Sequence, residues 1–207
     1  VQTYAGPLEL NCKRLMLSII HDVTEQKRLK NELQLAASRD HLTGLWNRRH
    51  FIGLLDKARL QKRRNDLDYC LLLLDVDHFK HINDQFGHEK GDEALILLAR
   101  TLEERTRETD SVCRWGGEEF LLLLPSTTAD QAFRVCEHLR HVMADTLYHT
   151  PEGQPFALSM SFGYSACHVA ADLNRALQMA DRGLYDAKDA GRNCVRPALP
   201  ASIPCHS

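Results

Sequence analysis

The chain has 207 residues, of which 43% are hydrophobic and 26% charged, a balance typical of a globular protein with its own core. Its formal net charge of -2 argues against a general binder of the nucleic-acid backbone, so we expect neither DNA nor RNA as a partner. The seven scattered cysteines lack a Cys-x-x-Cys motif, and no run approaches the ~18 apolar residues of a membrane span. We therefore expect free thiols in a cytoplasmic chain, or in the cytoplasm-facing part of a membrane-anchored one.

The N-terminal residues 8–21 alternate loosely between apolar and polar side chains and predict one or two strands around an Asn-Cys-Lys turn. Alone they can bury little apolar surface. We therefore expect residues 1–23 to be the last strands of a domain that lies mostly upstream.

Residues 24–38 predict a helix that Thr24 can cap. Its apolar positions recur at steps of four and three, the seam spacing of a coiled coil, at Leu29, Leu33 and Ala36. A helix this short is not stable in isolation, which favours pairing with a second copy of itself. The alternative is a helix that lies on its own domain.

A turn around Gly44 precedes a predicted helix from Asn47 to about Arg64. The segment "YCLLLLDVDHF" then predicts a strand that is apolar on both faces, and such a strand lies centrally in a covered sheet. This strand ends in two carboxylates, Asp75 and Asp77.

A short turn of helix and two glycine breaks lead into a long amphipathic helix from about Asp92. Its predicted buried stripe consists of Ala94, Leu95, Leu98, Ala99 and Leu102. "SVCRW" and "EFLLLL" then predict two strands joined by Gly116-Gly117, a strong hairpin signal.

After the hairpin, residues 129–144 predict a helix, "FALSMSFGYSA" a strand, and "LNRALQMADRGLYDAKDAG" a helix closed by Gly191. The proline-rich tail from Pro197 is predicted to be disordered. Strand and helix order over residues 69–166 predicts a ferredoxin-like βαββαβ core of the α/β (α+β) class. Right-handed crossovers put both core helices on one face, and the outer helices can cover the other.

In this topology the first core strand lies beside the hairpin, so Asp75 and Glu118 can converge. Two carboxylates with no basic residue between them are costly unless a cation is present. Oxygen ligands suit Mg²⁺, which completes its shell with water and substrate phosphate. Gly116 and Gly117 would let phosphates or a nucleobase approach the backbone. The alternative is a solvated acidic hairpin.

Neighbouring polar residues favour the metal–phosphate hypothesis. Lys80 can offset charge on a phosphoryl group, and Asn83 and Asp92 offer an amide and a carboxylate that suit a guanine. Lys188 and Arg192 lie one helical turn apart and suit a triphosphate. Taken singly, Asn83 and Asp92 are better explained as turn and cap residues, and Lys188 and Arg192 alone as a solvated helix end.

Several long segments in a fixed order resemble a GGDEF domain, the catalytic domain of diguanylate cyclases. They are "RDHLTGLWNRRHF", "DVDHFKHINDQFGHEKGDEAL", "RETDSVCRWGGEEF", "SMSFGYS" and "ADRGLYDAKDAGRN". The signature is spelled "GGEEF" here. The resemblance assigns residues 39–196 to this catalytic domain and implies a palm-type core with a central sheet flanked by helices.

The resemblance implies that two GTP molecules condense into cyclic di-GMP and release two pyrophosphates, with each subunit of a homodimer holding one GTP. Mg²⁺ is the implied cofactor, with Mn²⁺ as a substitute. The implied metal ligands are Asp75, the backbone carbonyl of Val76, Glu118 and Glu119. Glu118 is also implied to accept the proton of the attacking 3′-hydroxyl.

The lysine implied to stabilise the transition state is Lys80. The implied substrate-binding positions are Asn83 and Asp92 at guanine, His88, the signature glycines Gly116 and Gly117, and Phe79, Lys188 and Arg192 at the phosphates. "RETD" matches the Arg-x-x-Asp inhibitory site through Arg107 and Asp110, at which the product cyclic di-GMP would bind; a solvated helix end is the alternative.

The N-terminal "LSIIHDVTEQKRLKNEL" resembles the exit from a PAS sensor domain and implies such a sensor upstream in cis, acting through paired helices. The resemblance as a whole implies an active, product-inhibited diguanylate cyclase. A degenerate module that senses GTP or cyclic di-GMP is the alternative, but Asp75, Lys80, Glu118 and Glu119 are all present. An adenylate cyclase would need an adenine-reading pocket.

Overall fold

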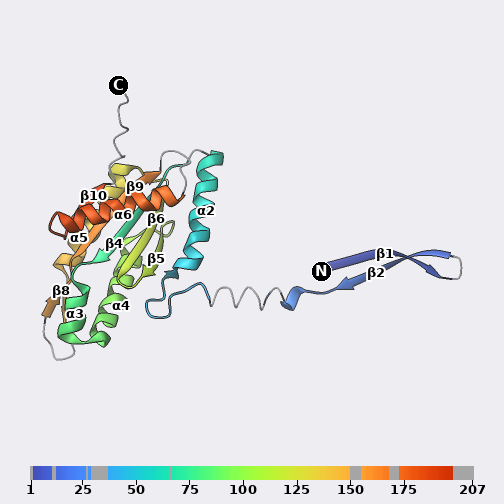
Figure 1. The fold of residues 1–207 in the computed structure, drawn as a ribbon, viewed down its shortest axis with the longest axis horizontal. Coiled ribbons are helices and arrows are strands. Elements are labelled where there is room, and N and C mark those ends of the chain that lie inside the picture. The colour runs from blue at the N-terminus through green and yellow to red at the C-terminus, as the bar shows by residue number, and fades with distance from the viewer. Residues whose placement is uncertain are drawn as a thin grey trace, which may run out of the picture. The chain divides into compact units, whose positions relative to one another are not determined.

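The structure is a computed structural model that describes residues 2–10, 13–26, 28, 37–65, 67–149, 155–167 and 173–197. Its contacts divide the chain into two compact units, Val1–Arg39 and Asp40–Ser207 (Figure 1). In the part of the chain that is described, no helix has both the length and the apolar character needed to cross a membrane.

The first unit contains an antiparallel strand pair, β1 (Gln2–Leu10) and β2 (Lys13–His21). One or two strands were expected over residues 8–21; there are two, and the first begins at Gln2, well before residue 8. In the turn after β2, Thr24 donates hydrogen bonds to Asp22. Asp22 Oδ1 accepts them from the Thr24 backbone nitrogen (2.9 Å) and hydroxyl (2.6 Å). The predicted coiled-coil seam at Leu29, Leu33 and Ala36 lies outside the described residues, so it stays a prediction.

A six-stranded sheet forms the centre of the second unit, in the order β10-β9-β4-β6-β5-β3. The strands are β3 (Trp46–Asn47), β4 (Tyr69–Val76), β5 (Ser111–Gly116), β6 (Glu119–Pro125), β9 (Met160–Cys167) and β10 (Val195–Pro197). The inner four pair antiparallel in the order of a ferredoxin-like core, which confirms the predicted fold. The parallel edge strands β3 and β10 were not predicted, because two or three residues carry no periodic signal.

Two pairs of helices cover the two faces of this sheet (Figure 1). The helices of the unit are α2 (Arg48–Asn65), α3 (Phe79–Phe86), α4 (His88–Arg105), α5 (Ala129–Asp145) and α6 (Leu173–Asp189). Buried side chains of α4 and α5 pack on one face, and those of α2 and α6 on the other. Every residue of β4 is buried between these layers, as its uninterrupted apolar sequence predicted.

Two predicted boundaries were wrong. Helix α4 begins at His88 rather than near Asp92, and Gly91 lies inside it, buried. Gly87 is the actual break, with a φ of 87° that favours glycine. The strand predicted in "FALSMSFGYSA" is divided into β8 (Pro155–Ala157), which pairs with β7 (Leu147–His149), and β9.

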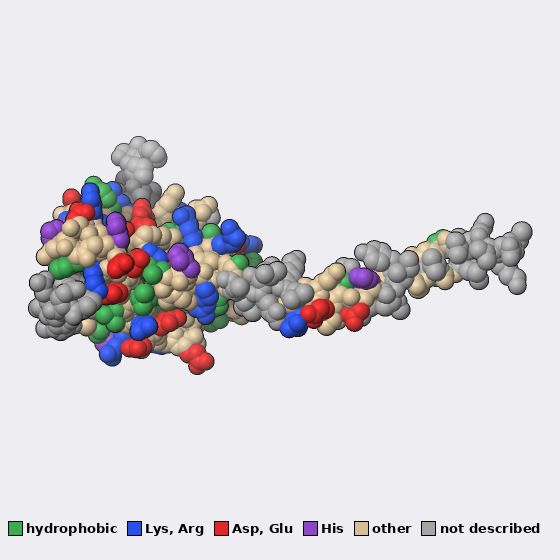
Figure 2. Space-filling model, turned by 90° about the horizontal axis from the view of Figure 1, so that it is seen from below, with side chains coloured by type: hydrophobic (Ala, Val, Ile, Leu, Met, Phe, Trp, Pro, Cys, Tyr) green, Lys and Arg blue, Asp and Glu red, His purple; other side chains and the backbone are tan. Residues whose placement is uncertain are grey.

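The surface of the second unit carries charges of both signs. On the face drawn in Figure 2, acidic and basic side chains are interspersed over the described residues.

Candidate active site

The acidic end of β4 lies against the glycine hairpin, as the topology predicted. Asp75 is the register partner of Glu119 on β6, and on its other side it faces Ser161 of β9. The backbone nitrogen of Val76 donates to the carbonyl oxygen of Glu118 at 3.3 Å. The sheet therefore brings Asp75, Val76 and both signature glutamates to one point.

A basic residue lies at this point, contrary to our expectation. Lys188 Nζ, from the last turn of α6, lies 2.9 Å from Asp75 Oδ2, and the Asp75 side chain is only 9% exposed. Sequence reasoning assigned Lys188 to a triphosphate and could not place it at Asp75, because no local pattern links a helix end to a distant strand.

Burial and like charges oppose Lys188 in their effect on the pKa values of this acidic cluster. Burial raises the pKa of Asp75, as do Glu118 and Asp77, while the ion pair with Lys188 opposes the rise. Burial also raises the pKa of Glu119, and the Asp75 carboxylate adds to that rise. Further positive charge at this point would therefore be stabilising.

An arginine that sequence reasoning missed holds the hairpin. Arg114 Nε donates to the carbonyl oxygen of Gly117 at 2.9 Å, and its Nη1 lies 3.1 Å from Asp40 Oδ1. Both side chains of this ion pair are about 15% exposed. Gly117 has a φ of 51°, and a Cβ built on it or on Gly116 would meet nothing within 4 Å. The hairpin backbone is therefore both fixed in place and open to a ligand.

The second strand-end carboxylate, Asp77, has a structural role. It is 3% exposed and accepts hydrogen bonds from Ser159 Oγ (2.9 Å), Ser161 Oγ (2.7 Å) and the Asn193 backbone nitrogen (3.0 Å). These three donors satisfy the carboxylate without a cation. Asp77 ties the end of β4 to β9 and to the turn after α6, and none of these partners was identified from the sequence.

The packing of α3 on α4 places Asn83 against Gly91, the residue before Asp92. Gly91 lies so close to Asn83 that a Cβ at that position would overlap the Asn83 Oδ1 atom and lie 3.1 Å from Phe79 Cζ. Asp92 is the next residue, exposed on α4. Gly91 is thus explained by a close approach of side chain to backbone rather than by a helix break.

The other predicted residues lie near the ends of helices. Lys80 and His88 are exposed, near the starts of α3 and α4 respectively. Arg192 does not share a helical turn with Lys188, because α6 ends at Asp189 and Arg192 follows with a φ of 65°.

The Arg107–Asp110 segment forms a tight turn immediately before β5. The Asp110 nitrogen donates to the Arg107 carbonyl oxygen at 2.9 Å, and Asp110 Oδ2 accepts from the Arg107 nitrogen at 3.0 Å. Burial raises the pKa of Asp110, which the hydrogen bond from Arg107 opposes. Arg107 itself is exposed.

The donor chemistry at Asp75 fits a hard divalent cation, although the protein does not provide a complete coordination shell. Within the described residues, no group of three or more His, Cys, Asp or Glu side chains is arranged to hold a metal ion. Carboxylate and backbone oxygens suit Mg²⁺, which characteristically takes few protein ligands and relies on water and phosphate oxygens.

Curated proteins and solved structures are similar to this chain over most of its length. Diguanylate cyclase DgcM of Escherichia coli K12 is 46% identical over 198 residues, which cover 96% of this chain and 47% of that protein. Response regulator PleD of Caulobacter vibrioides is 38% identical over 172 residues, covering 82% of this chain and 38% of PleD. The chain therefore spans less than half the length of these curated relatives.

Solved structures share the fold as well, and two of them illustrate it. The coiled coil and GGDEF domain of DgcB from Caulobacter crescentus, in complex with c-di-GMP, superpose with a TM-score of 0.79 at 28% identity, covering 85% of this chain and 95% of that one. The active GGEEF domain of a diguanylate cyclase from Vibrio cholerae gives 0.70 at 31% identity, covering 75% and 98%. A family model for "Diguanylate cyclase, GGDEF domain" matches residues 37–194. With that match and this fold, the chain belongs to the GGDEF family of diguanylate cyclase domains.

Proposed function

We propose that this chain condenses two GTP molecules into cyclic di-GMP. The observation that carries the proposal is the convergence of Asp75 with the Gly-Gly-Glu-Glu hairpin at one open point of the sheet. It is supported by the names of the relatives, one of which is described as an active GGEEF domain. The sensor alternative is less favoured, because Asp75, Lys80, Glu118 and Glu119 are all retained.

The reaction is two phosphoryl transfers. The 3′-hydroxyl oxygen of one GTP bonds to the α-phosphorus of the other, and the bond from that phosphorus to pyrophosphate breaks; the second transfer closes the ring. Glu118 takes the proton of the attacking hydroxyl. Since one domain holds one GTP, two domains must face each other, and we propose a homodimer as the active form.

The other residues of the chain bind, orient and neutralise. Asn83 and Asp92 hold the guanine, with His88 as a further substrate contact. Lys80 offsets charge that develops on the transferred phosphoryl group. The phosphates are bound by Phe79, Lys188 and Arg192 beside the open backbone of Gly116 and Gly117. For Lys188 to contact a phosphate, its ion pair with Asp75 has to open.

A Mg²⁺ ion, or Mn²⁺ in its place, would be held by Asp75, Glu118, Glu119 and the Val76 carbonyl, and would neutralise phosphate charge and acidify the attacking hydroxyl. The raised pKa values of Asp75 and Glu119 support this assignment, because a cation would replace the proton that burial otherwise favours. An upstream PAS sensor that controls how the domains meet remains part of the proposal.

The proposed activity is tested by incubating the protein with GTP and Mg²⁺ and identifying the product by mass spectrometry. Cyclic di-GMP and two pyrophosphates per product molecule are expected, with an excess of ATP neither converted nor inhibiting strongly. GTP binding without any turnover would favour the sensor, and conversion of ATP would favour an adenylate cyclase.

Replacing Gly91 by Ala is expected to weaken GTP binding about tenfold, because the new methyl group overlaps Asn83 Oδ1 and pushes that side chain out of place. Stability should change little, since alanine favours the helix interior. Titration calorimetry with GTP measures the effect. Gly53→Ala is the matched control, because a Cβ there meets nothing within 4 Å. Equal GTP affinity in the two variants would remove Asn83 from the guanine site.

Replacing Arg107 by Ala is expected to raise the amount of cyclic di-GMP that accumulates before synthesis stops, with little change in initial rate. The reason is that an exposed Arg107 can form paired hydrogen bonds to guanine O6 and N7 of the product. Progress curves with added cyclic di-GMP measure this. Inhibition as strong as in the unaltered protein would show that the Arg-x-x-Asp turn is not the inhibitory site.

A further inference from the structure

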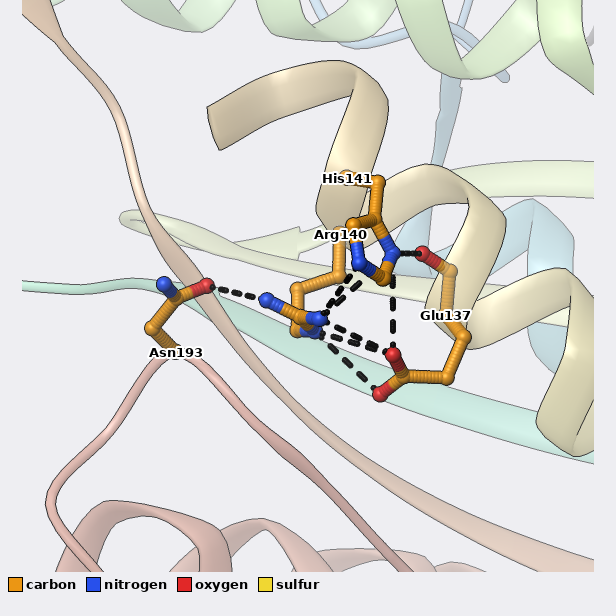
Figure 3. A network of polar contacts seen from close by, with 4 residues as sticks. All are labelled: Glu137, Arg140, His141 and Asn193. Atoms are coloured by element: carbon orange, nitrogen blue, oxygen red, sulfur yellow. Dashed lines mark hydrogen bonds and ion pairs between the residues drawn. The ribbon is translucent and has the colours of Figure 1, made fainter. Parts of the chain in front are cut away.

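A polar network on α5 reaches Asn193, which follows the end of α6 (Figure 3). The guanidinium of Arg140 donates from Nε and Nη2 to the Glu137 carboxylate, the shortest contact being 2.9 Å, and from Nη1 to Asn193 Oδ1 at 3.1 Å. The Arg140 side chain is only 17% exposed. Two bonds to Glu137 fix the plane of the guanidinium, so that Nη1 is directed at Asn193.

His141 closes the outer side of this network. Its Nδ1 lies 2.7 Å from the carbonyl oxygen of Glu137, and its Nε2 lies 3.0 Å from Arg140 Nη2. In the neutral tautomer with the proton on Nδ1, the ring donates to the carbonyl and accepts from Arg140. The donors of Arg140 are thus shared among Glu137, His141 and Asn193, and only the last lies outside α5.

The segment that Arg140 reaches has an unusual backbone. Gly191, Arg192 and Asn193 have φ values of 104°, 65° and 44°, a left-handed run that non-glycine residues seldom adopt. The Arg192 nitrogen donates to the Ala187 carbonyl oxygen at 3.1 Å, which anchors the turn to the end of α6. Such a conformation persists only when surrounding contacts determine it.

Asn193 is held at two points. Its side chain accepts from Arg140, and its backbone nitrogen donates to Asp77, the buried carboxylate two residues after Asp75. The backbone contact fixes where the turn lies relative to β4. The side-chain contact holds the turn at a second point, one residue after Arg192.

We propose that Arg140 is a positioning residue that sets the orientation of Arg192 for the β- and γ-phosphates of GTP, acting through the side chain of Asn193. This inference rests on the proposed function, because it takes Arg192 to be a phosphate contact. Arg140 itself touches no substrate in this proposal. It acts from the helix layer, on the turn that joins α6 to β10.

The test compares nucleotides that differ only in those phosphates. Replacing Arg140 by Gln is expected to weaken GTP binding about tenfold and to leave GMP binding unchanged, since GMP lacks the β- and γ-phosphates. In turnover, KM for GTP should rise while kcat changes little. Arg134→Gln, an exposed arginine on the same helix, is the control and should bind both nucleotides normally.

A double-mutant cycle separates positioning from general loosening. In an Arg192→Ala background, Arg140→Gln should change GTP affinity by no more than about twofold, because its effect passes through the missing side chain. Asn193→Gly, which tolerates the left-handed backbone but lacks the acceptor, should reproduce the GTP-selective loss. The Asn193→Gly variant also tests the proposal if the Arg140→Gln protein does not fold.

Additive effects in the cycle, or equal losses for GTP and GMP, would overturn the positioning role of Arg140. These binding measurements need no turnover, so they separate the two claims. A chain that binds GTP with this selectivity but makes no cyclic di-GMP would overturn only the proposed function. A chain that binds no GTP would overturn both.

Discussion

Replacing Glu118 by Gln is expected to slow cyclic di-GMP formation about a thousandfold and to leave the fold intact. The amide keeps the shape of the side chain but cannot accept the 3′-hydroxyl proton, and it removes an anionic oxygen ligand beside Asp75. Stability should not fall, because Glu118 is one of the like charges that raise the pKa of Asp75. Initial rates at saturating GTP, with circular dichroism and thermal unfolding alongside, measure both effects.

Glu104→Gln provides the matched control, since it makes the same chemical change at an exposed position on α4. It should retain the full rate. A Glu118→Gln protein whose rate stays within about tenfold of the unaltered protein would show that Glu118 is not the proton acceptor, whatever its part in metal binding.

The largest effect on stability is expected from Gly163→Ala, at about 3 kcal/mol of unfolding free energy. Gly163 lies on β9 where α6 packs against the sheet, and a Cβ there would overlap the Ala180 carbonyl oxygen and the Leu184 nitrogen. Both are helix backbone atoms, so relief requires moving α6 as a whole. Urea unfolding with an unchanged m-value measures the loss.

Gly53→Ala is again the appropriate comparison, because it adds the same methyl group on α2 with nothing within 4 Å. It should be neutral, or stabilising by about 0.5–1 kcal/mol through helix propensity. If Gly163→Ala were as stable as Gly53→Ala, the close packing of α6 on β9 would be wrong. Moving α6 would also move Lys188, in its last turn, and the turn that bears Arg192, so activity should fall together with stability.

The sequence predicted those parts of the fold whose patterns are long and local. The uninterrupted apolar strand β4 and the glycine hairpin fixed the order of the inner strands, and that order brought Asp75 to the hairpin. The short edge strands could not be predicted from such patterns, because β3 and β10 form by pairing with residues far along the chain.

Among the site residues, too, local motifs could be recognised from the sequence and distant contacts could not. Motif resemblance found the residues proposed to meet GTP, but not those that hold them in place. Arg114 pairs with Asp40 across 74 positions, and Asn193 meets Asp77 across 116. No local periodicity in the sequence predicts contacts between residues so far apart. Gly91 was taken for a helix break because the residue it approaches, Asn83, becomes its neighbour only when α3 packs on α4.

The glutamate pair of the hairpin illustrates what the structure adds to a motif. From the sequence, its neutralisation required a cation. In the structure, Lys188 already pairs with Asp75, yet burial still raises the pKa of both Asp75 and Glu119. One lysine therefore balances only part of the charge, and a divalent cation arriving with a triphosphate remains the favoured complement.

The rate of cyclic di-GMP formation from GTP and Mg²⁺, measured per subunit over a wide range of protein concentration, tests the central claim most directly. Two GTP-loaded domains must meet for each product molecule. The account therefore predicts cyclic di-GMP as the product and a rate per subunit that climbs with concentration until dimers are saturated. Absence of cyclic di-GMP at high GTP and high protein concentration would contradict it.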